Sequence, residues 1–465
     1  MDQAVSPVLG SREEKRSFYK RTLRIIMPIA LQNLMDAAVN SADVLMLSFV
    51  SQSALAASSL AGQIAFVMFN MIYGISSGAS VMAAQYWGKG DRRTVEKVLG
   101  LALRVALLIS ALFTLAALVI PELLMRIFTG DPALIADGVI YLRAVALSYF
   151  LSAFSSVYLG VMRSVGRVKT CAAIHISAVF MNVFFNAAFI FGLGPFPRLG
   201  IFGVGLATTI TRAIEVFLCL WDNARCTALR LKLRDLFARS ATLMRDFIHF
   251  AVPAAANDIV WGLAFSVYSV ILGHLSSDIV AANSVASVVR NLGGAFCFGA
   301  SAAAAIVLGQ SLGSNRLKEA RAYAFRFMML AVWTALVGGV VILLLRPFVL
   351  NFMHLYVDVT DVVKSELSIM LFISSYYILG TSVNAMMICG VFRAGGDVRY
   401  GLLCDTITMW GYAVPVGLLC AFVFKLPEMW VYFILCLDEF VKIPINIWHY
   451  KKMKWLRNIT REQTE

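Results

Sequence analysis

The feature of this sequence that most restricts its fold is a series of long apolar stretches that recur from Leu23 to Trp448. A helix of roughly 20 mostly apolar residues crosses the hydrocarbon core of a membrane, which is about 30 Å thick. Backbone groups in lipid must be satisfied within the structure, and these stretches are too long and too evenly apolar for barrel strands. We therefore predict an all-α membrane protein.

The composition supports this prediction. Only 14% of the 465 residues are charged and 60% are hydrophobic, with a mean hydropathy of +0.78, whereas soluble domains carry about 25% charged residues. The twelve predicted transmembrane helices are 20–48, 55–85, 94–119, 134–162, 169–192, 202–224, 246–273, 281–311, 320–346, 364–390, 398–424 and 429–450. The first one follows a basic segment without a small-residue cleavage site, so we expect a retained helix and not a signal peptide.

The net charge of +13 lies mainly in alternate connections between the predicted helices. Thirty lysines and arginines fall on one side, which includes both terminal segments, and five fall on the other. Cytoplasmic connections of membrane proteins carry such an excess of basic residues. We therefore expect both termini in the cytoplasm, and no nucleic acid as a partner.

The eight cysteines and five histidines do not follow a pattern typical of a disulfide framework or a metal site. Nearly all the cysteines lie in apolar stretches without close pairs, so we expect small core residues. The sequence has no Gly-rich lysine loop for ATP and no evident pair of nucleophile and base. We expect no enzyme and no cofactor, so any uphill transport would draw its energy from an ion gradient.

The chain matches itself in one constant register, without a gap, from Pro28 to about Asp91. The matching pairs include Pro28 with Pro253, Ser41 with Ser266, Gly74 with Gly299, Gln85 with Gln310 and Gly88 with Gly313. Farther along, at a slightly larger offset, GVMRSVGRVK meets GVFRAGGDVR, so that Arg163 pairs with Arg393. A constant register that keeps a proline, a glutamine and several glycines is not expected by chance, so we infer an internal duplication.

The duplication predicts two pseudo-symmetric six-helix lobes. Because six is even, both halves cross the membrane in the same direction, and an axis along the membrane normal should relate them. We predict an N-terminal lobe at 20–224 and a C-terminal lobe at 246–450, joined by a basic cytoplasmic linker at 225–245 and flanked by basic tails at 1–19 and 451–465. The LRLKLRDLF stretch of the linker is expected to form an amphipathic helix on the membrane surface.

Ionisable side chains within the hydrocarbon are candidates for function, because a charge is costly there. Asp36 and Asp43 are seven residues apart on the first predicted helix, on nearly the same face, and either could take up a proton or bind a cation. Asn182 and Asn186 place two amide oxygens on one face of the fifth helix, and Thr208 lies on the sixth. Such oxygens suit a hard cation, although polar residues in bundles often only bond neighbouring helices.

The second half does not repeat these aspartates, because Asp36 falls opposite Trp261 and Asp43 opposite Tyr268. The two lobes are therefore expected to do different work. The candidates for a substrate cavity or a gate are Pro28, Asp258, Arg290, Tyr376 and Tyr377. Asp258 and Arg290 could form a structural ion pair, and the prolines Pro28 and Pro253 should bend their helices at matching depth, for structure or for gating.

Several motifs together resemble the multidrug and toxic compound extrusion (MATE) transporters. They are the early proline followed by an aspartate on the first helix, the second-helix ending GISSGASVMAAQYWGKGD, the run NVFFNAAFIFGLGPFPRLGIFGVGLATT and their echo in the second half. The resemblance covers nearly the whole chain. It implies twelve helices in two lobes, outward drug efflux and coupling to H⁺ or Na⁺.

The resemblance also implies roles for single residues. Asp43 matches the acidic residue of the first helix, and Asn182 and Asn186 match the paired polar positions of the fifth, with Thr208 as a companion. Some members carry an aspartate where this chain has Asn186. This chain therefore lacks one negative charge at that position, and the coupling ion, H⁺ or Na⁺, stays open.

We accordingly expect an antiporter that exports amphipathic organic cations or drugs in exchange for H⁺ or Na⁺, with Asp43, Asn182 and Asn186 as candidate Na⁺ ligands. We also expect membrane lipids as partners. The protein is expected to be a monomer in a bacterial inner membrane. The alternative is a flippase for lipid-linked precursors, which would need a cationic cavity for pyrophosphate. The mid-membrane charges are mainly acidic, with Arg212 and Arg290 as exceptions.

Overall fold

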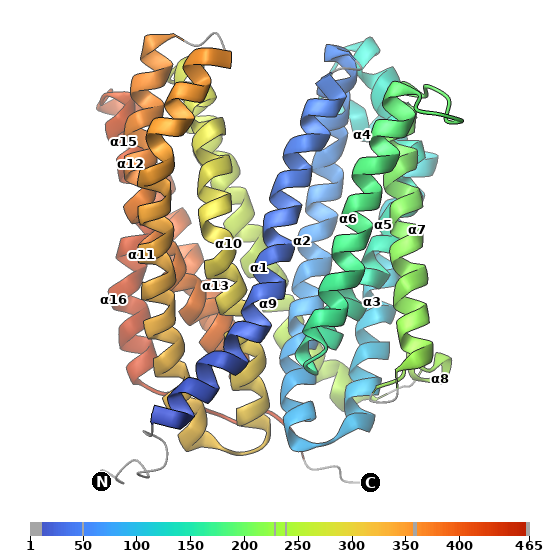
Figure 1. Ribbon diagram of the computed structural model, residues 1–465, viewed down its shortest axis with the longest axis vertical. Coiled ribbons are helices and arrows are strands. Elements are labelled where there is room, and N and C mark those ends of the chain that lie inside the picture. The colour runs from blue at the N-terminus through green and yellow to red at the C-terminus, as the bar shows by residue number, and fades with distance from the viewer. Residues whose placement is uncertain (1–11, 49–50, 227–228, 238–239, 357–359, 462–465) are drawn as a thin grey trace. The chain divides into compact units, whose positions relative to one another are not determined.

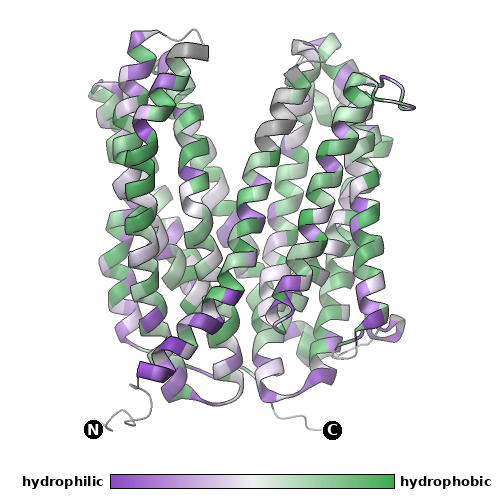
Figure 2. Cartoon of the chain, viewed as in Figure 1, coloured by the Kyte–Doolittle hydropathy of each residue, from purple (hydrophilic) through white to green (hydrophobic). Residues whose placement is uncertain are grey.

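The computed structural model describes residues 12–48, 51–226, 229–237, 240–356 and 360–461. Within these ranges the chain is almost entirely helical and contains no β-strand, as Figure 1 shows. Figure 2 shows the long helices as predominantly hydrophobic along their length. The prediction of an all-α membrane protein is confirmed.

The predicted transmembrane segments correspond to the long helices. Ten helical stretches in the described residues are long and apolar enough to cross a membrane. The other two predicted segments, 20–48 and 429–450, coincide with α1 (Arg12–Ser48) and with the pair α15 (Glu428–Leu435) and α16 (Asp438–Lys451). The last of these carries Asp438, Glu439 and Lys442 in its first helical turns.

Two compact units make up the chain: an N-unit, Leu34–Ala255, and a C-unit that combines Met1–Asn33 with Ala256–Glu465. The boundaries fall inside α1 and inside α9 (Ala241–Gly273), shortly after Pro28 and Pro253, and both helices continue past their proline. The predicted division, by contrast, lies in the connection 225–245.

The helices that lie wholly within the N-unit are α2 (Gln52–Lys89), α3 (Arg92–Val119), α4 (Pro121–Arg126), α5 (Pro132–Ser164), α6 (Val168–Phe191), α7 (Gly200–Arg225) and α8 (Leu233–Leu236). Helix α2 approaches the beginning of α9 closely at two glycines. A Cβ on Gly74 would lie 2.1 Å from the Cα of Ala255, and one on Gly78 would lie 2.5 Å from the Cα of Ala251. Small residues at these positions let the two backbones meet, as is common between membrane helices.

The C-unit adds, after the second part of α9, α10 (Ser277–Gly313), α11 (Leu317–Tyr356), α12 (Asp361–Ala385), α13 (Val398–Asp405), α14 (Val414–Leu418), α15 and α16, with π-helical segments η2 (Met386–Phe392), η3 (Thr406–Ala413) and η4 (Leu419–Val423). The wider turns of π-helical segments often occur at functional sites. The beginning of α1 also packs into this unit, where Phe18 stacks on Tyr323 and Arg326 pairs with Glu14 at 3.3 Å.

Turn and cap geometry repeats in the register found in the sequence. Ser51 caps α2 by accepting a hydrogen bond from the backbone N–H of Ala54, and its counterpart Ser276 caps α10 in the same way. Gly90 at the end of α2 and Asn315 at the end of α10 both have positive φ, 86° and 59°. The duplication is therefore visible in the local structure of both halves.

The linker differs from the prediction of a surface helix. Only Leu233–Leu236 of LRLKLRDLF forms a helix, the four-residue α8. The side chain of Asn223 fixes the preceding backbone, because its amide accepts from the N–H of Leu231 at 2.7 Å and donates to the same residue's carbonyl at 3.2 Å. An extended segment bonded in this way cannot continue a helix.

The eight cysteines are all free thiols, and seven of them are buried, which agrees with their predicted place in the core.

Candidate functional site

A chain of four charged or titratable side chains crosses the N-unit. The imidazole of His175 on α6 contacts Asp36 on α1 through Nε2 at 2.9 Å and Glu215 on α7 through Nδ1 at 3.0 Å. The other carboxylate oxygen of Glu215 accepts from Arg212 at 2.8 Å and from the hydroxyl of Ser155 at 2.9 Å. One histidine thus joins two carboxylates on two other helices.

The side chains of this relay, Asp36–His175–Glu215–Arg212, become steadily less exposed toward its centre. Asp36 is 46% exposed, His175 19% and Glu215 1%. Exposed carboxylates in a membrane protein face water and not lipid, because a charge in hydrocarbon is costly. The relay therefore leads from an accessible carboxylate to a buried one.

The charges of the relay balance only when it holds a proton. With a neutral imidazole the two carboxylates face a single guanidinium, whereas a proton on His175 makes two positive and two negative charges. Histidine is the side chain best suited to gain and lose a proton near neutral pH. The arrangement therefore favours binding of one proton, and release of that proton leaves one carboxylate charge without a counter-charge.

The predicted ion ligands Asn182 and Asn186 lie beyond His175 on α6, and Thr208 precedes Arg212 and Glu215 on α7. Asn182 is seven residues after His175 on α6, and Nδ2 of Asn186 donates to Oδ1 of Asn182 at 3.2 Å, so these amides share a face as predicted. The hydroxyl of Thr208 donates to the backbone carbonyl of Val204 at 3.1 Å. The side chain of Asp43, seven residues after Asp36 on α1, lies outside the described residues.

The C-unit contains a second polar cluster that is deeply buried. Nζ of Lys442 on α16 lies 3.0 Å from Asp405, 3.0 Å from Glu439 and 3.9 Å from Asp438, and the lysine is only 1% exposed. Asn384 on α12 donates to Glu439 at 2.7 Å. These contacts hold α12, α13 and α16 together.

The proposed ion pair between Asp258 and Arg290 is wrong. Asp258 pairs with Arg393 at 2.6 Å, and Asn257 connects that guanidinium to Asp405 by accepting from Arg393 at 3.0 Å and donating to the carboxylate at 2.6 Å. Both aspartates therefore belong to the cluster around Lys442. Arg290 instead bonds the hydroxyls of Tyr432 and Ser287.

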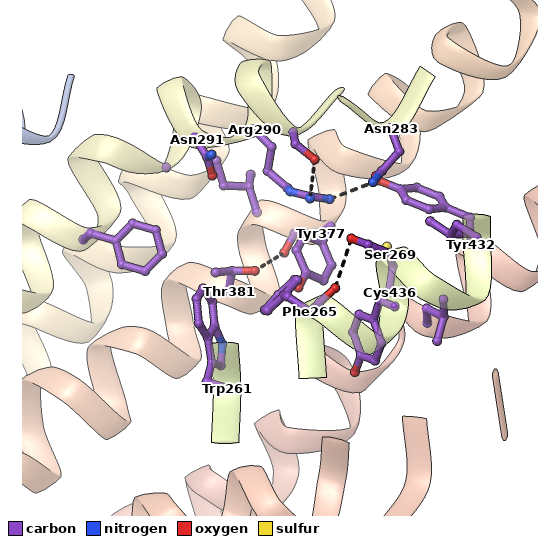
Figure 3. A pocket seen from close by; sticks show the side chains of 17 residues that line it. Trp261, Phe265, Ser269, Asn283, Arg290, Asn291, Tyr377, Thr381, Tyr432 and Cys436 are labelled. Atoms are coloured by element: carbon purple, nitrogen blue, oxygen red, sulfur yellow. Dashed lines mark hydrogen bonds between the residues drawn. The ribbon is translucent and has the colours of Figure 1, made fainter. Parts of the chain in front are cut away.

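A cavity of about 290 Å³ lies within the C-unit, with Arg290 in its wall (Figure 3). Its aromatic side chains come from α9, α10, α12 and α15, namely Trp261, Phe265, Tyr268, Phe298, Tyr377 and Tyr432. Among its described lining residues Arg290 is the only ionised side chain. The structure thus brings two predicted cavity residues, Arg290 and Tyr377, to one cavity, whereas Tyr376 packs against Phe433 and Phe440 and does not line it.

Sequence reasoning missed several residues of these sites. The sequence has no pattern that distinguishes His175 from the other four histidines, and it does not predict a role for Glu215 or Lys442. Each of the three is nevertheless a charged or titratable residue within a predicted transmembrane helix. That position alone is a usable signal, because membrane helices rarely keep such residues without function or a partner.

The sequence matches the MatE family model twice, over residues 28–188 and 253–419. The chain belongs to the MatE family. The two matches begin at Pro28 and Pro253, the first pair of the internal repeat, which confirms the duplication. Its relatives include a transporter and a multidrug resistance protein, which agrees with the expected class of membrane transporter.

Curated relatives of this MatE protein align over most of its length. The uncharacterized transporter YisQ of Bacillus subtilis is 24% identical, with 98% of this chain and 99% of the relative covered. The multidrug resistance protein PmpM of Pseudomonas aeruginosa is 24% identical, with 86% and 84% covered.

Solved structures of other transporters have the same fold. A MATE protein in complex with MaL6 superposes with a TM-score of 0.87 at 18% identity, covering 98% of this chain and 99% of the other. A MOP superfamily transporter from Pyrococcus furiosus, described by the "reverse polarity" of its binding pocket, has a TM-score of 0.84 at 18% identity, with 94% and 96% covered. The two-lobe architecture of twelve helices is thereby confirmed.

Proposed function

We propose that this MatE protein is a secondary active antiporter that exports amphipathic organic compounds in exchange for protons. The observation that carries the proposal is the relay Asp36–His175–Glu215–Arg212, whose charges balance when His175 holds a proton. A proton that enters at Asp36 is shared with His175 and stabilised by Glu215. Its release to the opposite side of the membrane would complete one exchange.

Protons are favoured over Na⁺ by the partners of the polar side chains. A sodium ion needs several oxygen ligands around it, whereas the imidazole that Asp36 and Glu215 contact offers nitrogen and can carry a proton. The amide oxygen of Asn182 accepts from Asn186. Asp43 remains a proposed second carboxylate of the same path, seven residues farther along α1.

The proposed cargo follows from the relatives and from the cavity. PmpM is named a multidrug resistance protein, and a 290 Å³ cavity with aromatic walls suits a compound of one or two rings. A flippase for lipid-linked precursors is less well supported, because a pyrophosphate calls for several cations and the described cavity lining supplies only Arg290. We place the protein in a bacterial inner membrane with both termini in the cytoplasm.

The test is uptake into everted membrane vesicles of two radiolabelled probes, cationic ethidium and anionic 2-naphthoate. The proton and sodium gradients are collapsed separately. We expect uptake of the transported probe to stop when the proton gradient is removed and to continue without sodium. Asp36→Asn should show the same loss, and Glu122→Gln, which removes an exposed carboxylate of α4 paired with Arg126, should not. Uptake that depends on sodium alone, or that persists unchanged in Asp36→Asn, would refute proton coupling through the relay.

A further inference from the structure

We infer that the cavity of the C-unit is a binding site for the negatively charged group of an aromatic organic anion, with Arg290 as its partner. The inference rests on the proposed function, because it names the charge of the exported compound. It differs from the sequence-based expectation of organic cations, which relied on the acidic residues of α1.

Arg290 lies in the first half of α10 and has only neutral partners among the described residues. Its guanidinium donates to the hydroxyl of Tyr432 at 3.1 Å and to the hydroxyl of Ser287 at 3.2 Å, and it lies 5.5 Å from the ring centre of Tyr377. No described carboxylate lies within ion-pair distance of it. Figure 3 shows this side chain among the residues that line the cavity.

Three other cations within the helical bundle each have a carboxylate partner. Lys442 contacts three carboxylates, Arg393 contacts Asp258 and Arg212 contacts Glu215. A cation held in a membrane without a counter-charge is costly. An anion in the cavity would supply the missing charge, and a guanidinium binds a carboxylate through two parallel hydrogen bonds.

The rest of the cavity lining suits the aromatic ring system of such an anion. Asn283, Ser287 and Arg290 follow one another at four and three residues on α10, so they form a polar stripe on one face of that helix. Opposite this stripe are the aromatic rings of α9, α12 and α15. A polar stripe with hydrogen-bond donors facing aromatic walls matches a flat ring system that carries one carboxylate.

The acidic cluster of the C-unit does not reverse this preference. Asp438 is fully buried and accepts a hydrogen bond from the hydroxyl of Tyr268 at 3.2 Å, and it does not line the cavity. Lys442 lies 3.9 Å from the same carboxylate. The tyrosine ring therefore stands between the cavity and a carboxylate that already has a cation and a donor.

The experiment compares three naphthalene ligands of nearly equal shape on the full-length protein in nanodiscs of neutral phosphatidylcholine. They are 2-naphthoate (anion), 2-naphthamide (neutral) and 2-naphthylmethylammonium (cation), measured by isothermal titration. We expect 2-naphthoate to bind at least about tenfold more tightly than the other two, the difference that one charge-assisted hydrogen bond typically makes. Equal affinities, or tighter binding of the ammonium compound, would overturn the inference without any mutation.

Variants then assign the preference to the guanidinium. Arg290→Gln should remove the preference for 2-naphthoate, and Arg290→Lys should keep part of it, because lysine retains the charge but not the planar fork. Arg346→Gln changes an arginine of α11 that bonds Ser368 outside the cavity and should leave all three affinities unchanged. Retention of the full preference in Arg290→Gln would overturn the assignment. If Arg290→Gln does not fold, the inference is tested by the affinities of Arg290→Lys and of the wild type for the three ligands.

Failure of this inference is distinguishable from failure of the proposed function. Loss of proton-driven uptake in Asp36→Asn vesicles tests the N-unit relay and does not involve the cavity. A preference for 2-naphthoate together with uptake that does not depend on protons would refute the coupling and leave the cavity assignment standing. Proton-dependent uptake without any preference for 2-naphthoate would refute only the cavity assignment.

Discussion

Replacing Lys442 by methionine should destabilise the C-unit by about 3–5 kcal/mol, the usual cost of removing one partner from a buried ion pair. The lysine is 1% exposed, and its ammonium lies 3.0 Å from both Asp405 and Glu439. Methionine has a similar volume, so no large cavity forms and the loss is electrostatic. Three carboxylates would then remain buried without the cation that lies between them.

The assay is thermal unfolding of the purified protein in detergent micelles, followed by fluorescence-detected size exclusion. At about 2–4 °C per kcal/mol for a unit of this size, the midpoint should fall by about 10 °C. Lys451→Met on the same helix removes an exposed lysine and should shift the midpoint by less than about 2 °C.

A compensating variant tests the electrostatic reason. Lys442→Met combined with Asp405→Asn and Glu439→Gln removes the two closest carboxylates together with the cation, and it should recover most of the lost stability, because neutral buried groups need no counter-charge. A midpoint for Lys442→Met within about 2 °C of the wild type would refute the reasoning. So would a triple variant less stable than the single one.

Three further predictions follow from named contacts. Gly74→Leu should lower the thermal midpoint in the same unfolding assay more than Gly62→Leu, because a side chain on Gly74 meets the backbone of Ala255 whereas Gly62 has open space; equal effects would contradict the close packing of α2 on α9. Arg393→Gln should destabilise the protein by about 3 kcal/mol, because it leaves the half-buried Asp258 without its cation. The double variant Asp258→Asn/Arg393→Gln, which neutralises both partners, should be less destabilised, and thermal unfolding that ranks it below the single variant would contradict the pairing. Asp43→Asn should abolish uphill probe uptake into everted vesicles while protein levels stay normal on a blot, and wild-type uptake would remove Asp43 from the proton path.

The large-scale fold could be predicted from the sequence because its signals are local or periodic. Apolar length marks each helix, and the constant register of the repeat aligns Pro28 with Pro253 and Ser51 with Ser276 without knowledge of any contact. For the same reason the shared face of Asn182 and Asn186 could be predicted, because it depends only on the helical period.

The candidate sites could be predicted only in part, because they depend on which helices meet. His175 lies 139 residues from Asp36 and 40 from Glu215 in the chain, so no spacing rule relates the three. Asp258 and Arg290 lie on consecutive helices, yet Asp258 bonds Arg393 on the chain beyond α12. The neutral surroundings of Arg290 are likewise a property of the packed C-unit. The predicted linker helix is wrong because the side chain of Asn223, near the end of α7, bonds the backbone of Leu231, which the amphipathic pattern does not reveal.

The relay in the N-unit is tested most directly by His175→Gln in proteoliposomes. Glutamine keeps a hydrogen-bond donor near these carboxylates but cannot carry a proton at neutral pH. We predict that this variant loses accumulation of the transported probe against its gradient when a proton gradient is imposed, while it retains exchange of labelled for unlabelled probe across the membrane without a gradient. Proton-driven accumulation at the wild-type level in His175→Gln would contradict the account.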